Sequence, residues 1–180
     1  LKNRAPVPPE IREKVRSIVT DVKDRGDPAV QAYAQAYDNV ALAPADFAVD
    51  TAAMERASEQ VPADVKEAID TACANVTAFA RRSVPQNWTF TPREGVELGE
   101  QFSPLSRVAA YIPGGTAPLI STVVHTVAIA KTAGVEDIIV TTPSRSDKSV
   151  HPALLYAAGR AGASAVYRLG GVYAIAAFAY

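Results

Sequence analysis

Two pairs of adjacent glycines are the residues whose type and spacing could best serve a binding site. The first pair, Gly114 and Gly115, follows a short apolar segment ending in Tyr111 and precedes Pro118, in the first turn of an expected helix. Glycine lets a ligand approach the backbone closely, and free amides at a helix start attract negative charge. The pair therefore either lines a ligand cleft or makes a strand-to-helix turn that needs positive φ.

The second pair, Gly170 and Gly171, stands in the same relation to a later apolar segment and is followed by Val172 and Tyr173. In open parallel sheets, ligands bind at the carboxyl ends of the strands. Two glycine turns at the ends of neighbouring strands would therefore share one pocket.

The usual dinucleotide motif is absent. Neither glycine pair fits the pattern G-x-G-x-x-G, and the segment that should carry a ribose-binding acid ends in Thr141, Thr142 and Pro143 instead. A dinucleotide bound here would have to be held in another way.

The sequence offers few residues that could bind a metal ion or act as a nucleophile. The two histidines, His125 and His151, have no zinc-ligand spacing, so we expect no complete zinc site within these residues. His125 either lines the pocket or is an ordinary helix residue whose hydrogen bonds are satisfied. We expect His151 at the surface near a helix start. Cys73 lies on an apolar stripe and is expected in the core.

Composition narrows the class of protein. The chain has 180 residues, 48% of them hydrophobic, and a formal net charge of −1. Because no basic stripe is present, we expect no nucleic-acid partner. No apolar run reaches the roughly 18 residues that span a bilayer, and the first residues lack the apolar core of a secretory signal, so we expect neither membrane association nor secretion. One cysteine fits a reducing cytoplasm. The first residue is not Met and the last expected helix ends without a cap, so we expect the natural chain to continue.

Hydrophobic periodicity divides the chain into two regions. Residues 1–106 read as a helical front with an irregular extended hinge, in which 83–106 is a small meander or hairpin. Residues 107–180 alternate between strand and helix, which predicts a parallel sheet. The expected helices are 10–25, 27–37, 51–60, 62–82, 118–132, 149–160 and 172–180, and the expected strands are 107–112, 135–142 and 165–169.

These motifs resemble the histidinol dehydrogenase family. The similarity rests on Tyr-Ile-Pro-Gly-Gly at 111–115, followed in order by Gly-Gly-x-x-Ala-Ile-Ala-Ala at 170–177. It covers nearly the whole chain, weakly through 40–100 and strongly from 107.

The resemblance implies an α/β fold whose second region begins a Rossmann-like NAD-binding domain, incomplete at the carboxyl end. It implies a cytoplasmic homodimer that uses NAD and zinc to oxidise the small alcohol L-histidinol to L-histidine, in histidine biosynthesis. The family's zinc ligands and its Glu-His acid–base pair would fall beyond Tyr180, so we expect no catalytic residue here and no activity from the isolated chain. The residues expected to contact the cofactor are Tyr111, Pro113, Gly114, Gly115, Gly170, Gly171 and Tyr173.

One departure from the family pattern leaves alternatives open. Tyr173 stands where the family has a glutamine that touches NAD, and a phenol cannot reproduce an amide's paired donor and acceptor. A paralogue that oxidises another small diol, such as a sulfonated propanediol, is one alternative. A non-catalytic nucleotide-binding or assembly module is another.

Overall fold

A parallel sheet forms the centre of the molecule in the computed structural model, which describes residues 7–114 and 118–180. Among these residues, β3 (Arg107–Tyr111), β4 (Asp137–Thr141) and β5 (Ala165–Tyr167) pair in the order β3-β4-β5. All pairing is parallel, with Val108 opposite Ile138 and Val140 opposite Val166. The predicted parallel sheet is confirmed, and the carboxyl ends of all three strands lie at one edge.

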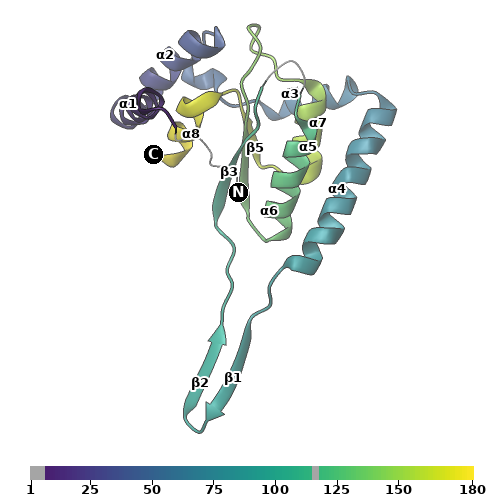
Figure 1. Ribbon diagram of the computed structural model, residues 1–180. Coiled ribbons are helices and arrows are strands. Elements are labelled where there is room, and N and C mark those ends of the chain that lie inside the picture. The colour runs from purple at the N-terminus through teal and green to yellow at the C-terminus, as the bar shows by residue number, and fades with distance from the viewer. Residues whose placement is uncertain (1–6, 115–117) are drawn as a thin grey trace.

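Helices connect the strands and cover one face of the sheet. A continuous helical stretch between β3 and β4 comprises α5 (Ile120–Val123), the π-helical η2 (Val124–Ala128) and α6 (Ile129–Thr132). The next crossover contains α7 (Pro152–Ala161). Helices α3 (Thr51–Glu59) and α4 (Ala63–Ser83) pack on the outside of this layer (Figure 1).

The opposite side of the molecule is built from the first and last helices. α1 (Pro9–Arg25) and α2 (Asp27–Asp38) pack against α8 (Gly171–Ala179), which follows β5 and also contacts β3 (Figure 1). Their buried side chains form a second hydrophobic cluster that includes Val30, Leu169 and Tyr173. The helical front thus contributes to both sides of the sheet.

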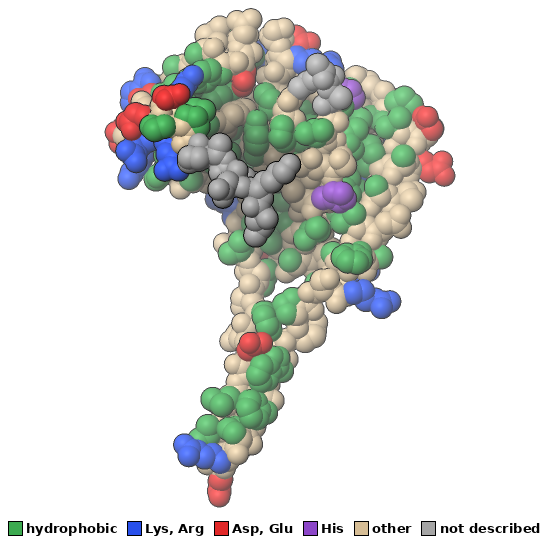
Figure 2. Space-filling view, in the orientation of Figure 1, with side chains coloured by type: hydrophobic (Ala, Val, Ile, Leu, Met, Phe, Trp, Pro, Cys, Tyr) green, Lys and Arg blue, Asp and Glu red, His purple; other side chains and the backbone are tan. Residues whose placement is uncertain are grey.

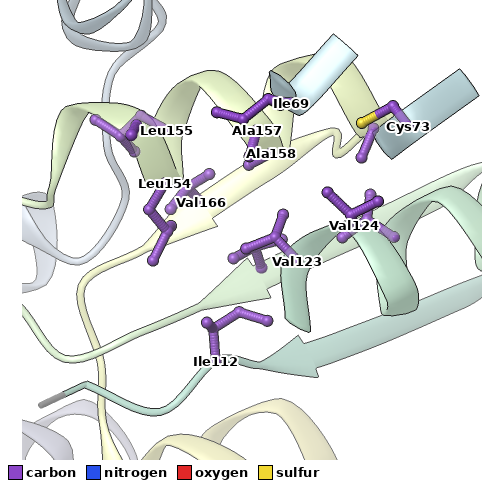
Figure 3. Packing of buried hydrophobic residues seen from close by; sticks show 14 of the residues in the cluster. Ile69, Cys73, Ile112, Val123, Val124, Leu154, Leu155, Ala157, Ala158 and Val166 are labelled. Atoms are coloured by element: carbon purple, nitrogen blue, oxygen red, sulfur yellow. The ribbon is translucent and has the colours of Figure 1, made fainter. Parts of the chain in front are cut away.

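The larger core lies between the sheet and the α5–α7 layer (Figure 3). β4 carries Ile138, Ile139 and Val140 in succession, and all three are buried. Such a run is typical of a parallel strand covered on both faces, and branching at Cβ favours the extended backbone. Cys73 lies in this core, as the sequence predicts.

A long β-hairpin projects away from the body (Figure 1). β1 (Trp88–Arg93) and β2 (Val96–Glu100) pair antiparallel and turn at Gly95, whose φ is +76°. The predicted hairpin in 83–106 is therefore confirmed. Large apolar side chains, among them Phe90 and Leu98, stay about half exposed along it (Figure 2).

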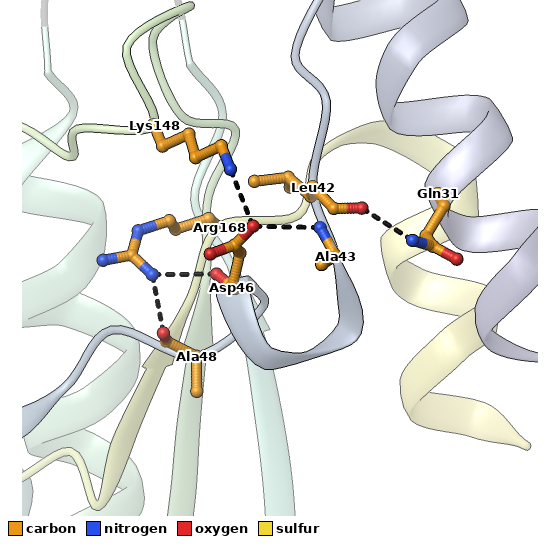
Figure 4. Close-up of polar contacts among 7 residues, drawn as sticks. All are labelled: Gln31, Leu42, Ala43, Asp46, Ala48, Lys148 and Arg168. Atoms are coloured by element: carbon orange, nitrogen blue, oxygen red, sulfur yellow. Dashed lines mark hydrogen bonds and ion pairs between the residues drawn. The ribbon is translucent and has the colours of Figure 1, made fainter.

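The β5 edge of the sheet is covered by the segment after η1 (Pro44–Asp46). The Val49 amide donates to the Val166 carbonyl at 2.8 Å, and the Arg168 amide donates to the Phe47 carbonyl at 2.7 Å. The Arg168 side chain also donates to main-chain carbonyls of this segment (Figure 4). Residues far apart in the sequence are joined here at the strand end.

Two predicted caps and one predicted helix start differ from the structure for local reasons. The sequence favours Thr51 as a cap, but Asp50 caps α3, because its carboxylate accepts the Ala53 amide at 2.5 Å. It also favours Asp27 as a cap, but the N-cap of α2 is Gly26. α7 begins at Pro152 instead of 149, since Arg145 and Ser149 close a turn at 2.9 Å.

Helical spacing in the sequence groups several apolar side chains of the front helices with core residues, yet some of them lie outside the core. α1 buries Ile18 and Val22 but leaves Ile11 and Val15 exposed, and Phe79 at the end of α4 is 77% exposed. None of the described helices is long and apolar enough to cross a membrane.

The buried core of the sheet predicts that replacing two different isoleucines with alanine has very different effects on the free energy of unfolding. Ile138→Ala removes a fully buried side chain and should lower the free energy of unfolding by about 2–5 kcal/mol. Ile129→Ala, at a position 48% exposed, should change it by less than about 1 kcal/mol. Urea denaturation followed by circular dichroism measures both, and equal losses would contradict the core described here.

Candidate functional site

A cleft opens at the edge of the sheet where the strands end. Its volume is about 560 Å³. The lining comes from the segments after β3, β4 and β5, with additions from α2 and the start of α7. The described residues that line it are Asp38, Tyr111, Pro113, Gly114, Pro118, Thr142, Pro143, Ser144, Arg145, Ser149, Val150, His151, Leu154 and Gly171.

Pro143, just beyond β4, lies between the two glycine turns. A Cβ added to Gly114 would lie 2.3 Å from Pro143 Cγ, and one added to Gly170 would lie 2.8 Å from Pro143 Cβ. Neither position can accept a side chain without displacing the proline ring. The structure therefore brings the two turns to the same edge of the sheet, one on each side of Pro143. The strands that they follow, β3 and β5, are not the neighbours that the sequence predicts, because β4 lies between them.

Gly171 has a different reason to be glycine. Its φ is +58°, which disfavours side chains, and no atom lies within 4 Å of the space its Cβ would take. The Gly171 amide donates to the Tyr111 hydroxyl at 3.3 Å, which links the second turn to the end of β3. This open stretch of backbone faces the cleft. Gly115, which the sequence groups with these residues, lies outside the described residues.

Tyr173 supports the second turn from inside the protein. The residue is only 1% exposed and is not part of the cleft lining. Its hydroxyl donates a short hydrogen bond to Asp38 and accepts the Gly170 amide at 3.1 Å. Burial, and then the Asp38 carboxylate, raise the pKa of the Tyr173 hydroxyl. The phenol thus stays protonated and ties α2 to the turn.

The cleft also holds polar side chains that sequence reasoning missed. Arg145 and Ser144 lie in a segment that reads as solvated surface, yet both line the cleft. His151 lines it as well, and its Nδ1 accepts the Ala153 amide at 3.2 Å, which caps α7. A histidine directly before a proline at a helix start is the sequence signal that could have identified this cap.

The protonation of His151 follows from its position. Burial, and then the nearby Arg145 charge, lower the pKa of His151. Because Nδ1 accepts a hydrogen bond, the neutral ring carries its proton on Nε2. His151 is therefore a neutral donor at physiological pH.

Other candidates lie outside the cleft. His125 is exposed and does not line the cleft, so of its two predicted roles the structure favours that of an ordinary helix residue. Cys73 is buried, and burial raises the pKa of its thiol. Across residues 7–114 and 118–180, no group of three His, Cys, Asp or Glu side chains could hold a metal ion.

This arrangement suits binding better than bond making. The one carboxylate among the cleft residues, Asp38, already accepts the Tyr173 hydroxyl. Arg145 supplies positive charge, His151 supplies a neutral donor, and the glycine turns supply open backbone. A ligand with a negative part and an extended polar body fits these groups.

Comparison with known proteins points to one family. The family model described as histidinol dehydrogenase matches residues 2–180. Histidinol dehydrogenase of Haloarcula marismortui is 45% identical over 170 residues, which cover 94% of this chain and 39% of the relative. That of a Synechococcus species is 41% identical over 166 residues, or 92% of this chain and 38% of the relative.

A solved structure agrees with these matches. The crystal structure of histidinol dehydrogenase from Elizabethkingia anophelis superposes with a TM-score of 0.88 at 29% sequence identity. It covers 97% of this chain and 40% of that protein. The chain therefore spans about two fifths of the length of the relatives it matches.

Because Gly114 packs against Pro143, whereas Gly159 has free space around it, alanine should change the free energy of unfolding in opposite directions at the two positions. Gly114→Ala should lower the free energy of unfolding by about 1–3 kcal/mol, because the new methyl group meets the proline ring. Gly159→Ala, inside α7, meets only Met54 Cε at 4.0 Å and should raise it by up to about 1 kcal/mol. Thermal unfolding of both variants is the measurement, and an undisturbed Gly114→Ala variant would contradict the geometry.

Proposed function

The chain belongs to the histidinol dehydrogenase family, and we propose that it forms the NAD-binding part of an enzyme that oxidises L-histidinol to L-histidine. One observation carries the proposal. The two glycine turns of the family-like motifs meet on either side of Pro143, at the carboxyl edge of a parallel sheet. Such edges are where open α/β sheets bind ligands.

The cleft residues fit an elongated dinucleotide. Gly171 offers backbone that a ligand can approach closely, and Tyr111 beside it offers an aromatic face. Arg145 lies where it can attract the diphosphate. When bound, NAD would supply the hydride acceptor for oxidation of an alcohol. Pro113 and Gly114 also line the cleft.

Tyr173 takes a supporting role in this proposal. Its ring lies beneath the turn, where its hydroxyl holds the Gly170 amide and Asp38. We propose that it sets the position of Gly170 and Gly171 instead of contacting the cofactor. A tyrosine at this position is therefore no reason to infer a different substrate, so the paralogue acting on a sulfonated propanediol or a similar diol has no observation in its favour.

Zinc does not fit the residues described. No group of three potential ligands is present among them, so we derive no step through a metal here. We propose that the zinc ligands and the acid–base pair lie in the part of the whole enzyme that this chain does not include. The isolated chain should then bind NAD without oxidising histidinol.

The organisation of the whole enzyme is part of the same proposal. We propose that residues 107–180 begin a Rossmann-like domain and that residues 1–106 form its helical front. A cytoplasmic homodimer is the assembly that the family implies. The alternative proposal is a non-catalytic nucleotide-binding module, which would use the same cleft but would not oxidise an alcohol.

The proposed NAD site predicts the effect of removing one tyrosine. Tyr111→Ala should weaken NAD binding to the 180-residue chain by about tenfold, or 1.4 kcal/mol, because it removes the aromatic wall and the partner of Gly171. The matched control Tyr180→Ala, at a residue 69% exposed directly after α8, should bind NAD as the parent does. Isothermal titration calorimetry measures all three.

Two results would contradict this proposal. Absence of NAD binding to the parent chain would remove the cofactor site. Steady NADH formation from histidinol and NAD by the 180-residue chain with added zinc would show that the catalytic groups lie within it.

A further inference from the structure

A second cavity, of about 390 Å³, adjoins the same loop but has a different lining. It brings together Arg56 from α3, Arg145 from the loop after β4, and Arg168 from just beyond β5. We infer that this arginine cavity binds a phosphate group. The inference does not require the NAD site, because Arg56 and Arg168 do not line the cleft, although Arg145 lines both cavities.

Arg168 has a donor left over. Its Nη1 donates to the carbonyls of Asp46 at 2.8 Å and Ala48 at 2.6 Å (Figure 4). Its Nε is buried and has no hydrogen-bond partner among the described residues. That Nε is too deeply buried for a ligand in the cavity to reach. Arg168 Nη2 makes no hydrogen bond with the described residues and is not among the buried atoms, so it is the donor available to a bound anion.

The positive charge of the cavity is largely uncompensated. Neither Arg145 nor Arg168 forms an ion pair with a carboxylate in the part of the chain that the structure describes. Asp46, whose main-chain carbonyl accepts from Arg168, has its carboxylate paired with Lys148 Nζ at 2.7 Å (Figure 4). Arg56 has only a loose, exposed contact with Asp50 at 3.8 Å.

One carboxylate lines the cavity, and its bonding is local. Asp147 Oδ1 accepts the Ser149 amide at 2.9 Å, which shapes the turn. Three guanidinium groups against one carboxylate leave an excess of positive charge. An anionic ligand is therefore favoured over a cation or an apolar ligand.

The geometry of the donors favours phosphate. Guanidinium groups are planar forks that match the oxygens of a phosphate, and groups from three separate elements can contact different oxygens of the same dianion. The cavity is small, so the ligand is inorganic phosphate or the phosphate of a small monoester. Inorganic phosphate and a phosphate monoester present the same kind of phosphate oxygens to the arginines.

Inorganic phosphate titrated into the ¹⁵N-labelled 180-residue chain tests the site, with chloride used to keep the ionic strength constant. We expect saturable shifts of the Ser149 and Arg168 amides. Arg56→Gln should weaken binding about fivefold, because it removes a cation without breaking a buried contact. Asp147→Asn should tighten it, since the amide oxygen can still accept from Ser149 while the opposing charge is gone.

Arg16→Gln is the matched control, because Arg16 is an exposed arginine on α1, at 75% against 64% for Arg56, and does not line the cavity. It should leave the affinity unchanged. Glycerol 3-phosphate in a parallel titration separates the sources, since tighter binding than inorganic phosphate indicates an ester ligand. Shifts spread over all surface cations, or an equal effect of Arg16→Gln and Arg56→Gln, would overturn the inference.

Discussion

The closeness of three chain segments around Pro143 is the constraint on which the cleft depends. Parallel pairing brings the ends of β3, β4 and β5 to one edge, and the two glycines allow backbone to pack directly on both sides of the proline ring. A side chain at either glycine would separate the turns. The cleft therefore depends on the parallel pairing of the strands and on glycine, which has no Cβ atom, at positions 114 and 170.

The helical front sets the position of this edge through one partly buried hydrogen-bond network. Asp38, at the end of α2, accepts the Tyr173 hydroxyl, which in turn accepts the Gly170 amide. Because α1 and α2 pack on α8 in the second hydrophobic cluster, the network connects that cluster to the cleft. Residues early in the sequence therefore support a turn near its end.

Much of the fold follows from patterns that are local in sequence. The buried run at 138–140 and the alternation of strands and helices predict the parallel sheet, and Gly95 lies at the tip of the expected hairpin. The sequence could not predict the π-helical turn at Val124–Ala128, because it places no glycine or proline there. The choice of a cap such as Asp50 depends on side-chain geometry that the sequence pattern does not show.

The candidate site was less predictable than the fold. Arg145 looks like solvated surface in sequence, and it lines a cleft because a tertiary contact, Lys148 with Asp46, holds its loop in place. Tyr173 is at the third position of α8, where its hydroxyl reaches back to the amide of Gly170 at the N-cap. No spacing rule in the sequence encodes the Asp38 carboxylate that meets it.

The most direct measurement of the central claim is an NAD titration of the ¹⁵N-labelled chain followed through its glycine amides. If the two turns form one cofactor wall, the amides of Gly114, Gly170 and Gly171 shift together and give a single dissociation constant. If only one turn responds, or if shifts gather on the hairpin while these three amides stay fixed, the two turns do not form a cofactor site.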